Sequence, residues 1–106
     1  MQITANQALI SLENTDKAFV ELFQHGTLSV EMYRPVEIDL QQPHEKDEVY
    51  IVISGTGDFF CDGKTVAFQA GDFLFVPAGV EHRFERFTED FATWVIFYGP
   101  KGGEKA

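Results

Sequence analysis

The sequence predicts an all-β sandwich or barrel, and three observations lead to this fold class. Short apolar runs of strand length alternate with turn signals rich in Gly, Pro and Asp along the 106 residues. Asp62-Gly63, flanked by apolar segments, is one of the strongest short signals for a β-hairpin. No long segment has the apolar period of a helix that would compete with the strands. A closed or two-sheet arrangement would also remove the exposed edges that so many strands would otherwise present.

The first third of the chain predicts a weak leading element and then a hairpin. Residues 5–10 are compatible with a helical turn or with an edge strand. Residues 19–23 and 27–33 have the composition of strands, and the glycine of His25-Gly26 permits the positive φ that a tight turn between them needs. We therefore interpret His25 as a turn residue rather than as a ligand.

The segment after Pro35 predicts a further, half-buried strand. Val36, Ile38 and Leu40 alternate with acidic residues, which is the two-residue period of a strand with one buried face. The remaining strands are expected at residues 48–54, 58–61, 64–68, 73–76, 81–87 and 91–98.

Length and composition predict one globular domain, residues 1–106, and exclude several classes of partner. Eleven phenylalanines support a packed core, and no window reaches the roughly 20 apolar residues of a membrane span. Seventeen acidic against eight basic residues give a net charge of −9, which repels nucleic acid and anionic membranes. The chain shows no signal-peptide pattern, so we expect a cytoplasmic location. Cys61, the single cysteine, cannot form a disulfide within the chain and is interpreted as a structural side chain.

Two histidines and a carboxylate form the candidate site. Residues two apart on a strand share a face, so Gln42 and His44 are expected to point the same way, while Glu48 lies on the next strand. His82 follows a Pro/Gly turn and begins another strand. If all these faces look inward, two imidazoles, one carboxylate and an amide surround one point. Such a set suits Zn, Fe, Mn or Ni and leaves coordination positions open. Taken one at a time, His44 and Glu48 are better explained by a solvated loop and His82 by a turn-end histidine, and it is their spacing to the surrounding glycines and proline that favours a shared site.

The spacing of these residues resembles the two sequence motifs of the cupin family. In the first motif, a histidine is followed after three or four residues by Glu and after six more by Gly, and this sequence has His44, Glu48 and Gly55. The second motif is Gly, five residues, Pro-x-Gly, two residues and His, and it is matched in register by Gly71, Pro77, Gly79 and His82.

Three positions depart from the cupin pattern. Val36 stands where the first motif begins with glycine, and Arg86 stands where the second ends with asparagine. Gln42 replaces the first histidine and matters most, because that position carries a metal ligand. An amide oxygen binds hard cations but is a weaker donor than imidazole to zinc.

The resemblance covers residues 36–98 and implies a cupin-type double-stranded β-helix, or jelly-roll barrel. Its core would span about residues 18–98, with residues 1–17 and 99–106 peripheral. It also implies a divalent metal ion (Zn, Fe, Mn or Ni) held by His44, Glu48, His82 and Gln42. The metal would serve an enzyme of the dioxygenase, isomerase or decarboxylase type that acts on a small organic substrate. The alternative is a non-catalytic small-ligand-binding or sensing module, including a metal-free one whose histidines hydrogen-bond the ligand.

Aromatic and basic side chains are expected to line a mostly apolar substrate pocket around the same point; they are Tyr33, Tyr50, Phe84, Arg86 and Trp94. Arg86 could pair with an acidic substrate or form a surface salt bridge. Residues 49–53 are apolar on both faces, so the outer face needs a cover from the N-terminal strands or from a partner subunit. We expect a homodimer, and the resemblance to small cupins that pair through such sheets implies the same.

Overall fold

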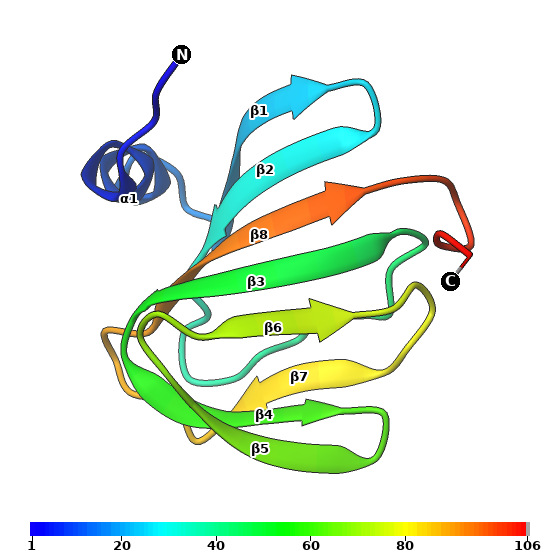
Figure 1. The fold of residues 1–106 in the computed structure, drawn as a ribbon. Helices are drawn as coiled ribbons and strands as arrows, with labels where there is room; N and C mark the ends of the chain where they lie inside the picture. Colours follow the sequence, from blue (N-terminus) through cyan, green and yellow to red (C-terminus); the bar gives the residue numbers. More distant parts are fainter. Residues whose placement is uncertain (106) are drawn as a thin grey trace.

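The computed structural model describes residues 1–105 and consists of one short helix and eight strands in two antiparallel sheets (Figure 1). The elements are α1 (Ala5–Glu13), β1 (Phe19–His25), β2 (Leu28–Tyr33), β3 (Asp47–Ser54), β4 (Thr56–Cys61), β5 (Lys64–Gln69), β6 (Phe73–Val76), β7 (His82–Glu85) and β8 (Ala92–Tyr98). The larger sheet has the strand order β1-β2-β8-β3-β6, and the smaller one has the order β5-β4-β7. This arrangement confirms the predicted all-β jelly-roll class.

The two sheets face each other across a core that is rich in aromatic side chains. Tyr50 and Val95 enter it from the larger sheet, and Phe59 and Phe84 enter it from the smaller one. The ring of Phe84 lies 4.8 Å from that of Tyr50 and 4.9 Å from that of Phe59, between centroids. Such aromatic pairs add to the free energy gained by burying the rings. The core therefore holds the inner face of β3 against β7, and these two strands carry the candidate site.

The hairpin predicted at Asp62-Gly63 is confirmed. The two residues join β4 to β5, and both have positive φ, 52° for Asp62 and 79° for Gly63. Positive φ at both central residues is the requirement of the tight turn that best matches the twist of a hairpin. The hairpin of β1 and β2 also forms, and His25 is the last residue of β1, directly before the turn.

The N-terminal segment forms a helix, which settles the alternative between a helical turn and an edge strand. The Thr4 hydroxyl accepts a hydrogen bond from the Gln7 N–H, and the Gln7 side-chain oxygen accepts one from the Thr4 N–H, so a capping box starts α1. Ala8 and Leu12 are buried against Met32 on the outer face of the larger sheet. Among residues 1–105, no helix has both the length and the apolar character needed to cross a membrane.

The strand predicted at residues 36–40 is wrong. This segment is irregular apart from one isolated bridge, and Val36, Ile38 and Leu40 are exposed. The buried residue is the polar one, Asp39, because its carboxylate accepts hydrogen bonds from the Tyr33 hydroxyl and from a backbone N–H of β7. Satisfying buried donors outweighs the apolar alternation here.

Candidate metal centre

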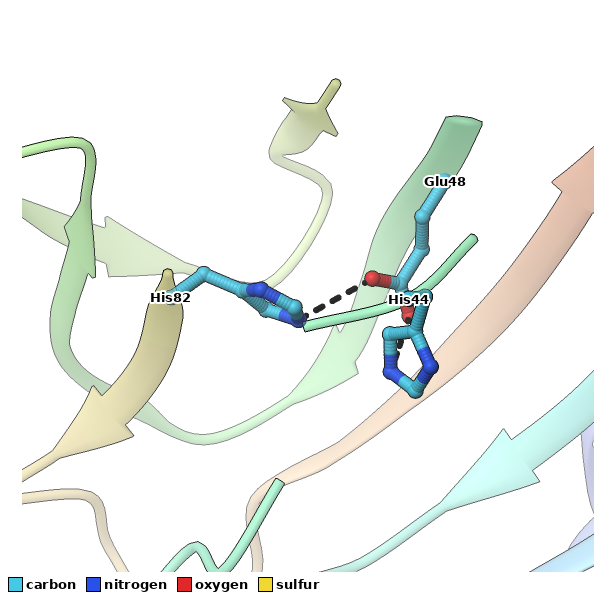
Figure 2. A group of neighbouring side chains, drawn as sticks. All are labelled: His44, Glu48 and His82. Atoms are coloured by element: carbon cyan, nitrogen blue, oxygen red, sulfur yellow. Dashed lines mark ion pairs between the residues drawn. The ribbon is translucent and has the colours of Figure 1, made fainter. Parts of the chain in front are cut away.

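The candidate site lies at one end of the barrel, where residues from both sheets converge (Figure 2). Glu48 is the second residue of β3 in the larger sheet, and His82 is the first residue of β7 in the smaller one. His44 lies in the loop that leads into β3, and its carbonyl accepts a hydrogen bond from the Gly79 N–H at 2.7 Å. The loop of one ligand is therefore tied to the turn that precedes another.

The three side chains come within the reach of a single metal ion. His82 Nε2 lies 3.1 Å from Glu48 Oε1, and His44 Nε2 lies 3.9 Å from Glu48 Oε2. One ligand atom from each residue lies within 4.8 Å of the others. Bonds of about 2.0–2.2 Å from a central ion to each atom fit such separations. Glu48 and His82 are fully buried, whereas the His44 side chain is 34% exposed.

The polar atoms at the centre of this cluster are not satisfied by the protein. Among the described residues, both carboxylate oxygens of Glu48 and Nε2 of His82 are buried without a well-aligned hydrogen bond. A buried carboxylate in that state is costly unless a cation compensates it. The donor set of two imidazoles and one carboxylate fits a divalent transition metal.

A hydrogen bond from Nδ1 fixes the orientation of the His82 ring. Its Nδ1 donates to the Val80 carbonyl at 2.9 Å, so in the neutral ring the lone pair is on Nε2, which faces Glu48. Burial lowers the pKa of His82, but the contacts with Glu48 and Val80 outweigh it and the pKa is raised. The pKa of His44 is lowered, chiefly by burial, so His44 is the imidazole that more readily stays neutral for a metal.

Gln41, rather than Gln42, lies beside the cluster. Gln41 Oε1 accepts a hydrogen bond from the Tyr50 hydroxyl at 2.9 Å and lies 3.5 Å from His44 Nε2. The Gln42 side chain is exposed. The expected shared face of Gln42 and His44 requires an extended strand, and residues 40–44 form an irregular loop instead.

A cavity of about 300 Å³ opens beside His44; the side chains around it are Phe19, Glu31, Tyr33, Gln41, His44, Val95 and Phe97. We call it the mouth. Glu31 contributes the mouth's only carboxyl group, and burial, followed by repulsion from Glu21 and Glu48, raises its pKa to about 7. Glu31 was not among the site residues predicted from the sequence. The strand period could have indicated it, because Glu31 is two residues before Tyr33 on one strand and therefore shares the face of this predicted pocket residue.

The predicted pocket residues separate into three groups. Tyr33 lines the mouth, and Tyr50 and Phe84 are buried directly beneath the cluster. Trp94 packs on the opposite, outer face of the larger sheet with the residues under α1. Arg86 lies beyond the end of β7 with φ of 50°, is exposed, and pairs with Asp58 at 2.6 Å. The structure thus places Trp94 and Arg86 away from the mouth, and Arg86 forms the surface salt bridge that was its alternative interpretation.

Comparison with known proteins decides the family. Residues 29–98 match the cupin domain family, which is well over half of the chain. The chain belongs to the cupin family. The match includes Glu48, His82 and the cavity strands β2 and β8, and the cupin motifs identified from spacing therefore lie within it.

Similar proteins are found in several bacteria. An uncharacterised protein of Streptomyces coelicolor is 34% identical over 88 residues, which cover 81% of this chain and 84% of that protein. The crystal structure of a cupin-2 domain containing protein from Shewanella frigidimarina has a TM-score of 0.69 and 24% identity, over 92% of this chain and 94% of that one. The structure of a predicted oxalate decarboxylase from Thermotoga maritima has a TM-score of 0.54 and 23% identity, over 67% and 64%. The two structures show that the fold is shared.

Proposed function

We propose that this cupin is a metal-dependent enzyme acting on a small organic molecule, with the metal held by His44, Glu48 and His82. The observation that carries the proposal is the buried Glu48 carboxylate, whose two oxygens lack hydrogen-bond partners while two imidazoles converge on it. A divalent cation would compensate the carboxylate and accept both imidazole lone pairs at once.

His44, Glu48 and His82 would hold a metal with three protein ligands and would leave further coordination positions for other ligands, and the mouth lies beside His44. When bound, a divalent metal supplies a Lewis-acid centre that can polarise a ligand oxygen. The protein supplies the surroundings: Phe19, Val95 and Phe97 give the mouth apolar walls that limit water, and His44 also lines it. Zn, Fe, Mn and Ni all suit this ligand set.

The shape and charge of the mouth restrict the substrate. About 300 Å³ admits only a small molecule, at the lower end of typical ligand pockets. The residues around the mouth include a carboxyl group but no Lys or Arg, so apart from the proposed metal no positive charge there would neutralise an anionic substrate. We therefore propose a substrate that is uncharged or positively charged and can donate hydrogen bonds to Glu31.

The alternative function, a non-catalytic small-ligand-binding module, is favoured by one observation. The Tyr33 hydroxyl already donates to Asp39, and the Gln41 side chain bonds both Asp39 and Tyr50. Outside the three proposed ligands, Glu31 is therefore the one side chain around the mouth that remains available as a general acid or base. So few groups for catalysis are what a binding module would have.

Metal analysis of protein purified without added metal or chelator tests the proposal. Near-stoichiometric Fe would favour oxygen chemistry, Zn would favour Lewis-acid chemistry, and metal without turnover of small carbonyl or polyol compounds would favour the binding module.

A ligand that binds only the folded state stabilises it, by about 2.7 kcal/mol at one hundred times Kd, so chelation of the metal should lower the melting temperature. His82→Ala should lose this response, whereas His25→Ala, which changes an exposed histidine at the end of β1, should keep it. A wild-type melting curve that is unchanged after verified chelation would refute the metal site.

We also propose that the protein is a homodimer through the outer face of its larger sheet. Two rows of residues cross the paired strands there: Val20, Met32, Trp94, Ile51 and Phe73, and Phe23, Val30, Ile96, Val49 and Phe75. None of them is charged, although the chain carries a net charge of −9. α1 covers one part of this face, and Phe73 and Phe75 at the far edge stay exposed. A second copy is the partner that fits, because like-charged chains can approach each other only where charge is absent.

A further inference from the structure

Asp47, the residue before Glu48, joins three segments that are far apart in the sequence. Its Oδ1 accepts a hydrogen bond from the Ala78 N–H at 3.0 Å, and its Oδ2 accepts one from the Glu104 N–H at 2.8 Å. The residue is only 5% exposed. Hydrogen bonds from backbone N–H groups to a buried carboxylate are charge-assisted and stronger than neutral ones.

The hydrogen bond from the Ala78 N–H to Asp47 connects the segments that carry all three proposed metal ligands. Ala78 lies in the turn before His82, and the next residue in that turn, Gly79, donates its N–H to the His44 carbonyl. Asp47 therefore ties the turn to β3 directly beside Glu48. Since β3 and β7 belong to different sheets, these bonds help to set the separation between Glu48 and His82.

The C-terminal segment, residues 99–104, closes this arrangement from outside. Gly102 donates its N–H to the Glu45 carbonyl at 2.8 Å, next to His44. At Gly103, a Cβ atom would lie 2.7 Å from Asp47 Oδ1 and 3.1 Å from the Ala78 Cβ. Such distances are too short for a side chain, so glycine is what allows the segment to lie against Asp47.

We propose that Asp47 and residues 99–104 form a positioning clamp that holds Glu48 and His82 at the separation a metal ion requires. The inference rests on the proposed metal site and adds to it a role for the C-terminal segment. Metal affinity is sensitive to such partners, since changing residues that orient metal ligands typically costs 10–100-fold in affinity.

Gly102 and Gly103 provide a matched pair of variants. Both have φ of 87°, so alanine strains the backbone equally at either position, but a Cβ at Gly102 meets nothing within 4 Å. We expect Gly103→Ala to weaken Co(II) binding about tenfold relative to Gly102→Ala and to change the cobalt absorption spectrum. Gly103→Ala should also have the lower melting temperature without metal, because its Cβ disturbs the hydrogen bonds of the buried Asp47 carboxylate, so the cobalt spectrum is the readout that a loss of stability alone would not change. Asp47→Asn should weaken binding as well, and adding Gly103→Ala to it should cost little more, because both act through one carboxylate.

Amide hydrogen exchange of the metal-free proteins separates the clamp from the metal site. Faster exchange of the Ala78 N–H in Gly103→Ala than in Gly102→Ala supports the clamp, whether or not the wild type binds Co(II). A wild type that binds no Co(II) would overturn only the proposed function. Equal exchange rates, or equal cobalt affinities and spectra in the two glycine variants, would overturn the clamp.

Discussion

Gln41 is a neutral side chain beside the proposed metal ligands, and its neighbour Gln42 provides a control. Gln41 Oε1 is held by the Tyr50 hydroxyl and lies 3.5 Å from His44 Nε2. We expect Gln41→Ala to weaken metal binding about tenfold, since it removes a group that orients His44. Gln42→Ala and Gln42→His should both match the wild type, because Gln42 is exposed. A competition titration against a chromophoric chelator measures all four proteins. Tighter metal binding by Gln42→His would instead place Gln42 among the ligands.

These two glutamines also show the limit of spacing arguments at the scale of single residues. The motif spacing selected His44, Glu48 and His82, and these three side chains do converge. Glu48 and His82 lie on strands with clear sequence signals, and His44 lies four residues before Glu48. The prediction of Gln42 depended on the motif register and on a strand period in a segment that is an irregular loop. No local pattern predicts how such a loop turns, because hydrogen bonds from Phe84 to Asp39 and from Tyr50 to Gln41 hold it.

Glu31 is expected to make the stability of the protein depend on pH. Its folded pKa of about 7 lies above the usual 4.5, so the folded chain binds this proton more tightly than the unfolded chain does. Stability from this group therefore falls as pH rises from 4.5 to about 7 and is constant above that window. In Glu31→Gln, which cannot ionise, the melting temperature should equal that of the wild type below the window and exceed it above the window.

The exposed Glu89 provides the control for this pH dependence. Glu89→Gln should follow the wild-type melting temperature across the whole pH range. Calorimetric scans of metal-free protein at several pH values make the comparison, so that metal release does not contribute. A difference between Glu31→Gln and the wild type that does not change with pH would contradict the raised pKa of Glu31.

At the scale of elements, the loop at residues 35–41 is held by one buried carboxylate. Asp39 accepts hydrogen bonds from the Tyr33 hydroxyl, the Phe84 N–H and the Gln41 amide. Asp39→Ala would leave buried donors without partners, each costing about 1–3 kcal/mol. We expect the free energy of unfolding to fall by about 3 kcal/mol or more. Ile38→Ala, one position away but exposed, should stay within about 0.5 kcal/mol of the wild type. Urea unfolding measures both, and similar losses would show that the apolar side chains hold the loop.

A helix, strand or turn was predicted correctly where residues close in sequence determine it, and less well where contacts distant in sequence do. The turn at Asp62-Gly63 is determined by the φ preferences of two residues, and it was predicted correctly. The sequence did not decide between helix α1 and an edge strand. Its capping box is a short signal, and its buried side chains contact strands distant in sequence. The alternation at residues 36–40 predicted a strand, but the partner of Asp39 lies on β7, 45 residues further on.

At the scale of the whole molecule, the two uncharged rows on the outer face of the larger sheet are the proposed contact between copies of the chain. Its two apolar rows end at Phe73 and Phe75, which are 62% and 44% exposed. Val66 is also apolar and 51% exposed, but it lies on β5 in the smaller sheet. These positions separate an effect of the proposed interface from a general effect of exposed apolar surface.

We expect the wild type to have twice the chain mass in light scattering at micromolar concentration. Phe73→Glu should shift it to the mass of a single chain, because each of two symmetric copies would bury an unpaired carboxylate in a face without cations. Val66→Glu should remain a dimer, since the same added charge would stay in water. Equal circular dichroism spectra would establish that both variants fold. A wild type of single-chain mass would refute the dimer, and dissociation by Val66→Glu alone would move the interface to the smaller sheet.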